Sequence, residues 1–77
     1  MWFKTQWGTL ENIDIFETIV IYRDKNGKFY IRGLLERGEA NNLAEYQMSK
    51  QAEQAMEEIM GKLIAGKHAM KMPVYPW

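Results

Sequence analysis

Residues 17–35, ETIVIYRDKNGKFYIRGLL, contain two runs of β-branched and aromatic residues with a polar segment, residues 24–27, between them. β-branched and aromatic residues favour strands, and the Asn26-Gly27 pair favours a tight turn with positive φ. The sequence therefore predicts a β-hairpin. The register of this hairpin decides which side chains face a core.

Two loop lengths give the same assignment of side chains to the two faces of the hairpin. A two-residue loop at Asn26 and Gly27, or a four-residue loop at residues 24–27, preserves it because successive side chains alternate across a strand. One face, predicted to be the core face, then carries Val20, Tyr22, Phe29, Ile31 and Gly33. The second face carries Ile19, Ile21, Arg23, Tyr30, Arg32 and Leu34. Only a three-residue loop would change this assignment.

The segments around the hairpin predict further strands. Residues 2–6 favour a first strand, residues 7–9 a turn, and residues 10–16 an extended lead into the hairpin. Residues 36–41 favour a loop, and residues 42–46 a short fourth strand. The sequence thus predicts an α+β fold, with an antiparallel three- to four-stranded meander followed by one amphipathic helix packed on one sheet face.

The predicted helix covers residues 49–65. Its apolar side chains recur at steps of three and four residues: Ala52, Ala55, Met56, Ile59 and Leu63. Ser49 suits the N-cap and Gly66 the position after the C-cap. Gly61 is unfavourable inside a helix, so either the backbone packs closely there or the last turn is weak.

Residues 68–77 form an apolar segment interrupted by Pro73 and Pro76. Proline blocks both helix continuation and a central strand. We therefore expect residues 1–67 to form one domain and residues 68–77 an extended tail. Tyr75 and Trp77 gain by burial, so the tail is expected to dock on the sheet or on a neighbouring chain.

Composition narrows the classes of function. The 77 residues include ten Lys plus Arg, ten Asp plus Glu and no Cys. Zero net charge gives no overall field that would attract nucleic acid or anionic lipid. Without cysteine there are no disulfides, thiolate nucleophiles or soft metal ligands. No apolar run reaches the ~18 residues of a membrane span, and we expect a cytoplasmic location.

The residues needed for catalysis or metal binding are few. The chain has a single serine, Ser49, and a single histidine, His68. A Ser-His-Asp arrangement needs a nucleophile, a base and an orienting group, and Ser49 and His68 are better explained by the two ends of the helix. Glu53 and Glu57 lie one helical turn apart without further oxygen or nitrogen ligands. We expect no enzyme activity, no cofactor, no metal site and no small-molecule ligand.

The functional hypothesis concerns the second face of the hairpin. One helix covers only one face of a small sheet, so the apolar side chains of the other face need the tail, solvent or a partner. We expect a small non-enzymatic interaction or accessory module that self-associates or binds a protein. Its predicted contact residues are Ile19, Ile21, Arg23, Tyr30, Arg32, Leu34, Tyr75 and Trp77. The alternative is single-stranded nucleic-acid binding through the basic hairpin, where Tyr30 could stack on a base.

Three segments carry a resemblance to known proteins: residues 1–6, MWFKTQ; residues 29–31, FYI; and residues 43–46, LAEY, ahead of the helical pattern. Over residues 1 to about 65 the chain resembles short uncharacterised proteins of Gram-positive bacteria and their phages. That resemblance implies a strand meander plus helix and an accessory role. Ala44 departs from it, because glycine is usual there, and the tail lies beyond it.

Overall fold

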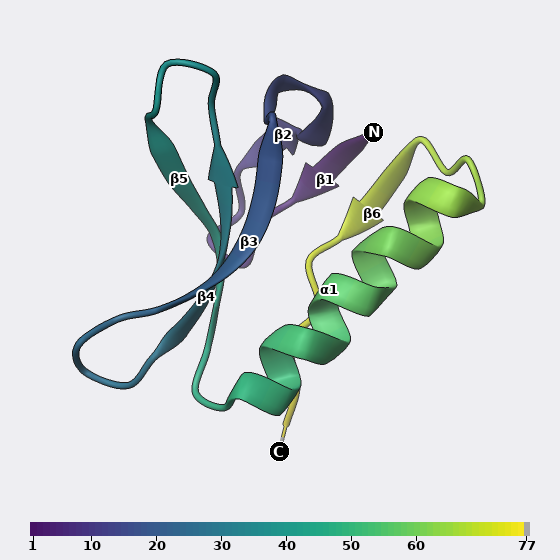
Figure 1. The fold of residues 1–77 in the computed structure, drawn as a ribbon. Coiled ribbons are helices and arrows are strands. Elements are labelled where there is room, and N and C mark those ends of the chain that lie inside the picture. The colour runs from purple at the N-terminus through teal and green to yellow at the C-terminus, as the bar shows by residue number, and fades with distance from the viewer. Residues whose placement is uncertain (77) are drawn as a thin grey trace.

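The computed structural model describes residues 1–76 and contains two small sheets and one helix (Figure 1). The sheet formed by β3 (Thr18–Arg23), β4 (Phe29–Leu34) and β5 (Ala40–Tyr46) is an antiparallel meander. The second sheet has the order β2 (Leu10–Asn12), β1 (Trp2–Lys4), β6 (Ala69–Lys71). The helix, α1 (Ser49–Ile64), contacts all three strands of the meander, and both sheets lie to one side of it (Figure 1).

The β3–β4 turn is a three-residue loop closed by Asp24 and Lys28. The Asp24 N–H donates to the Lys28 carbonyl at 2.9 Å, and the Gly27 N–H donates to the Asp24 carbonyl at 3.1 Å. Gly27 has a φ of +83°, a conformation open to glycine at no steric cost. The Asp24 carboxylate also accepts from the backbone N–H groups of Lys28 and Asn26, and these bonds hold its pKa below the ordinary value.

This turn changes the predicted faces of the hairpin, so that assignment is wrong. Tyr22 pairs with Tyr30 and Ile21 pairs with Ile31, one residue away from the pairing that a two- or four-residue loop would give. Ile19 and Ile21 therefore share the core face with Phe29, Ile31 and Gly33. The outer face carries Val20, Tyr22, Tyr30, Arg32 and Leu34.

The same three-residue turn recurs at the other two hairpins of the described chain. It joins Thr5 to Thr9 between β1 and β2, and Leu35 to Glu39 between β4 and β5. Gly8 and Gly38 occupy the position of Gly27, with φ of +87° and +88°. A type I turn followed by a left-handed glycine suits the twist of the paired strands.

β1 and β2 do not extend the meander, so the predicted four-stranded version is wrong. The short 3-10 helix η1 (Ile13–Ile15) separates β2 from β3, and its first residue is buried. β1 instead pairs antiparallel with β2 and parallel with β6, which makes this sheet mixed. The strand predicted at residues 42–46 is confirmed and begins earlier, at Ala40.

The helix follows the prediction closely, apart from its N-cap. Met48, rather than Ser49, occupies the N-cap position with extended backbone angles. At the other end the Gly66 N–H donates to Leu63, and the Lys67 N–H to Lys62, in a Schellman arrangement. Gly61 has no atom within 4 Å of where a Cβ would stand, so close packing does not explain it.

The core lies between the meander, the helix and the second sheet. Phe3, Ile31 and Leu43 are its largest fully buried side chains, and Met72 joins it from the segment after β6. The tightest contact is between Gly33 and Phe16, because a Cβ at Gly33 would stand 2.6 Å from Phe16 Cδ1. Because Gly33 has no side chain, the Phe16 ring can pack directly against the backbone of β4.

We expect Gly33→Ala to lower the free energy of unfolding by about 1–3 kcal/mol, because the added methyl group displaces a packed ring. Urea unfolding measures the effect. Gly61→Ala is the matched control, and we expect it to raise the free energy of unfolding by about 0.5–1 kcal/mol since nothing obstructs the methyl group. Equal effects of the two substitutions would contradict the close Gly33–Phe16 contact.

Candidate interaction surface

The outer face of the meander carries a linked group of aromatic and charged side chains. The Arg32 guanidinium lies 3.7 Å from the Tyr22 ring centroid, and its Nε donates to Asn42 Oδ1 at 3.0 Å. The Tyr30 hydroxyl donates to Glu45 Oε1 at 3.1 Å, and this hydrogen bond raises the Tyr30 pKa. The polar groups of Tyr30 and Arg32 therefore already have hydrogen-bond partners within the chain.

The predicted contact residues are divided between two sides of the sheet. Ile19, Ile21 and Arg23 lie on the core face, where Ile19 packs against the core while Ile21 and Arg23 remain exposed at the edge strand. Three lie half-buried on the outer face: Tyr30, Arg32 and Leu34. They do not form the single patch that the sequence predicted.

β3 is an edge strand whose second side pairs with no strand within residues 1–76. Ile21, 37% exposed, and Tyr22, 38% exposed, project from its two faces. No charged residue or proline interrupts residues 18–22. An apolar unprotected edge of this kind is a template for another strand. We refer to this free side as the β3 edge.

A second apolar feature lies on the helix. Met60, Leu63 and Ile64 are 53%, 46% and 80% exposed and share one flank because they lie three and four residues apart. The tail contacts another flank, where the Tyr75 hydroxyl donates to Glu58 Oε2 at 3.1 Å. Positions 58 and 60 point about 200° apart around a helix, so the tail leaves these side chains uncovered. We call Met60, Leu63 and Ile64 the helix stripe.

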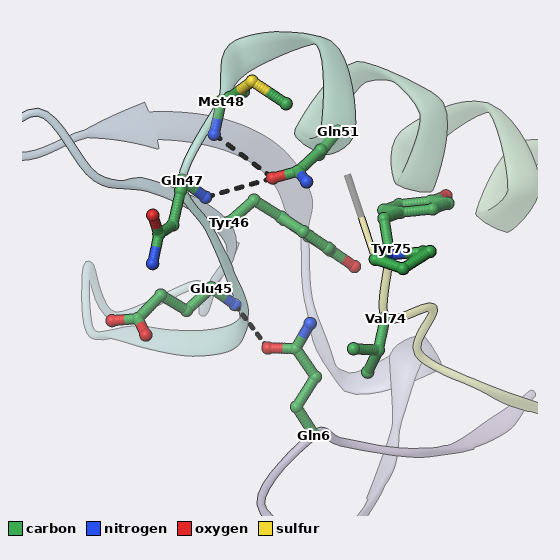
Figure 2. Close-up of a pocket in the computed structure, with 9 residues that line it drawn as sticks. Gln6, Glu45, Tyr46, Gln47, Met48, Gln51, Val74 and Tyr75 are labelled. Atoms are coloured by element: carbon green, nitrogen blue, oxygen red, sulfur yellow. Dashed lines mark hydrogen bonds between the residues drawn. The ribbon is translucent and has the colours of Figure 1, made fainter.

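The tail is held at a hollow of about 380 Å³ between β5, the start of α1 and residues 74–76 (Figure 2). The Gln6 side chain accepts from the Glu45 N–H at 2.7 Å and donates to the Pro73 carbonyl at 3.0 Å. Tyr46 donates to that same carbonyl at 2.7 Å. These bonds join the tail to β5 beside the hollow.

Tyr75, a predicted tail contact, packs against other parts of the same chain. Its ring lies 5.7 Å from that of Tyr46, and the side chain packs against the core. β6 also ties the tail to β1, with Met70 opposite Phe3. Trp77, the other predicted tail contact, lies outside the described residues.

Gln6 and Gln51 are structural contributors that sequence reasoning missed. Gln51 Oε1 accepts from the backbone N–H groups of Gln47 and Met48 at 3.2 Å each, and so caps the helix start (Figure 2). Gln51 stands three positions after the N-cap, a spacing typical of capping. No sequence pattern indicates the partners of Gln6, because Glu45 and Pro73 lie far from it along the chain.

Within residues 1–76 the structure shows neither a cluster of metal-binding side chains nor a helix that could cross a membrane. No group of three or more His, Asp or Glu side chains could hold a metal ion there. None of the helices within residues 1–76 is long and apolar enough to cross a membrane. His68 is exposed just after the helix, and Ser49 begins it.

Comparison with protein-family models, with curated proteins and with solved structures gave no match. The resemblance to short Gram-positive and phage proteins therefore stays a prediction.

We expect the free energy of unfolding to fall as the pH rises above about 10. Burial raises the pKa of Tyr46 above its ordinary value of 10.0, and burial with the Glu58 hydrogen bond raises that of Tyr75 to about 12. Both tyrosines ionise more readily in the unfolded chain, so their contribution to the free energy of unfolding is fully present below pH 10 and decreases as the pH rises above it, for Tyr75 between about 10 and 12.

Urea unfolding across this pH range tests the expectation. Tyr46→Phe and Tyr75→Phe should each flatten the decline, whereas Tyr22→Phe, at an exposed ring on the outer face, should leave it unchanged. An identical decline in all three variants and the wild type would assign the pH dependence to other groups.

Proposed function

We propose that this chain is a small module that acts by binding a protein, either another molecule or a second copy, and not by catalysis. The contact surface is the β3 edge together with the helix stripe. The observation that carries the proposal is the six-residue strand Thr18–Arg23, left unpaired on one side with an apolar side chain exposed on each face.

The other edge of the meander supports this choice by contrast. β5 contains a bulge, because Leu43 stands between the residues paired with Ile31 and Arg32. Gln6 also occupies the Glu45 N–H of that strand. Bulges and covered backbone groups are common means of preventing edge-to-edge pairing, and β3 has neither between Thr18 and Arg23.

The helix stripe adds side-chain area to the backbone template. Ile64 is 80% exposed and Met60 53%, and large apolar groups gathered on one flank favour a partner over solvent. Strand addition supplies backbone hydrogen bonds, while flanking apolar side chains supply specificity. The β3 edge and the helix stripe thus fit a partner that contributes both a strand and an apolar surface.

Photo-crosslinking in cells tests this function. We expect p-benzoylphenylalanine at position 22 or 64 to give a discrete covalent adduct to a protein, because both side chains belong to the proposed surface. The same probe at Arg37, exposed in the β4–β5 turn, is the control. Gels of irradiated cells measure the products. Absence of any adduct from positions 22 and 64 would contradict the proposal.

The nucleic-acid alternative has one favourable observation. Tyr22, Tyr30 and Arg32 lie on one accessible face, with the tyrosine ring centroids 6.5 Å apart. Against it, the Asp24 and Glu45 carboxylates accept from Tyr30, which places negative charge where phosphates would lie.

If the alternative holds, the fluorescence anisotropy of labelled single-stranded oligonucleotides should rise at low salt and fall steeply as salt increases. Arg32→Gln should then weaken binding more than Lys4→Gln, on the outer face of the other sheet. We expect no such salt-sensitive binding at micromolar protein, and its detection would favour the nucleic-acid function.

A further inference from the structure

We propose that β3 pairs antiparallel with β3 of a second copy about a two-fold axis at Val20. This inference rests on the proposed function and names the partner. The two meanders would then form one continuous sheet, with both helices on the same face.

Backbone direction follows from the β3–β4 turn. The Asp24 N–H donates to Lys28, and hydrogen-bonded positions alternate along an antiparallel strand. The N–H and C=O groups of Val20 and Tyr22 therefore point towards β4. Those of Ile19 and Ile21 point to the β3 edge, where no described residue bonds them.

Register follows from the sequence of the strand. A two-fold axis at Val20 places Ile19 of each copy opposite Ile21 of the other, so outward groups meet outward groups in hydrogen-bonded pairs. The same axis brings Glu17 of each copy, the residue before β3, near Arg23 of the other, which gives two opposite-charge pairs in all. These pairs involve the side chains alone, because the Glu17 N–H donates to the Leu34 carbonyl of β4 at 2.8 Å. Both side chains are exposed, and their charges have no other ion pair within the described chain.

A neighbouring register lacks these features. With the axis at Ile21, Arg23 would lie opposite Ile19, and Glu17 would be level with Lys25, which lies in the β3–β4 turn and outside the strand. An isologous contact requires a patch that complements itself, and the segment from Glu17 to Arg23 does so only about Val20.

Apolar side chains contribute to this pairing in addition to the backbone hydrogen bonds. Ile19 and Ile21 lie on the core face, the face that α1 covers. A second copy joined at β3 brings its own helix to that same face. Strand pairing alone buries less than the ~1,000 Å² of a stable specific interface, so we expect a weak dimer that forms at high concentration.

The remaining sheet edges are less suitable. The edge strands β2 and β6 have three residues each, against six in β3. β5 is interrupted by its bulge and by Gln6. The β3 edge is therefore the longest uninterrupted template among the described strands.

Charge exchange tests the register directly. We expect the wild type to dimerise, and Glu17→Arg or Arg23→Glu alone to weaken the dimer about tenfold or more, because each creates two like-charge pairs. Mixed together, the two variants should form a heterodimer in which both pairs are again opposite in charge. Sedimentation velocity from low micromolar to millimolar concentration measures all three states.

Glu39→Arg and Lys4→Glu are matched controls, since both positions are exposed and lie outside the proposed contact. We expect them to leave the dimer unchanged. A monomeric wild type at millimolar concentration, a dimer insensitive to both reversals, or a mixture without heterodimer would each overturn the inference. Adducts from position 22 or 64 to a different protein would still support the broader binding function.

Amide hydrogen exchange gives a second readout that does not depend on substitution. We expect the amides of Ile19 and Ile21 to become protected as concentration rises, because the dimer bonds them. Those of Val20 and Tyr22 should be protected at every concentration, since they bond to β4. Protection of Ile19 and Ile21 that does not change with concentration while a dimer forms would exclude the β3 edge as its contact.

Discussion

The register of the β3–β4 hairpin depends on Asp24 and Gly27, and the remaining packing depends on that register. The Asp24 carboxylate accepts hydrogen bonds from two backbone N–H groups, and Gly27, in the left-handed conformation, closes a loop of three residues. A loop one residue longer or shorter would exchange the faces of one strand relative to the other. Ile31 would then no longer share a face with Ile19 and Ile21, and the helix would meet a different surface.

The second sheet depends on contacts with the rest of the chain. β1, β2 and β6 contribute three residues each, too few for independent stability. Phe3 and Met72 connect this sheet to the common core, while Gln6 and Tyr46 bind the Pro73 carbonyl. Proline has no backbone N–H, so the carbonyl that accepts from Gln6 and Tyr46 is the only backbone hydrogen-bonding group of Pro73.

Local signals predicted the elements whose contacts are local. The helix and its Gly66 end were predictable because period and capping act within a few residues. The hairpin was predicted but its register was not, although the spacing from Asp24 to Gly27 recurs from Thr5 to Gly8 and from Leu35 to Gly38. β6 was not predictable, since its strand character comes from β1, at the opposite end of the described chain. The proposed contact surface was only partly predictable: Ile21 belongs to it, whereas the wrong register placed Ile21 on one face with Tyr30 and Arg32.

The parallel pairing of β1 with β6 has a consequence for how the chain folds. Trp2 lies beside Ala69, so this pairing closes a loop that contains both the meander and the helix. Loop-closure entropy disfavours such contacts until the intervening chain is compact. The meander and helix, whose contacts are short in sequence, are therefore expected to form first, and β6 to join last. The same order in reverse makes release of β6 the least costly local opening, which would uncover Phe3 while the hairpins remain intact.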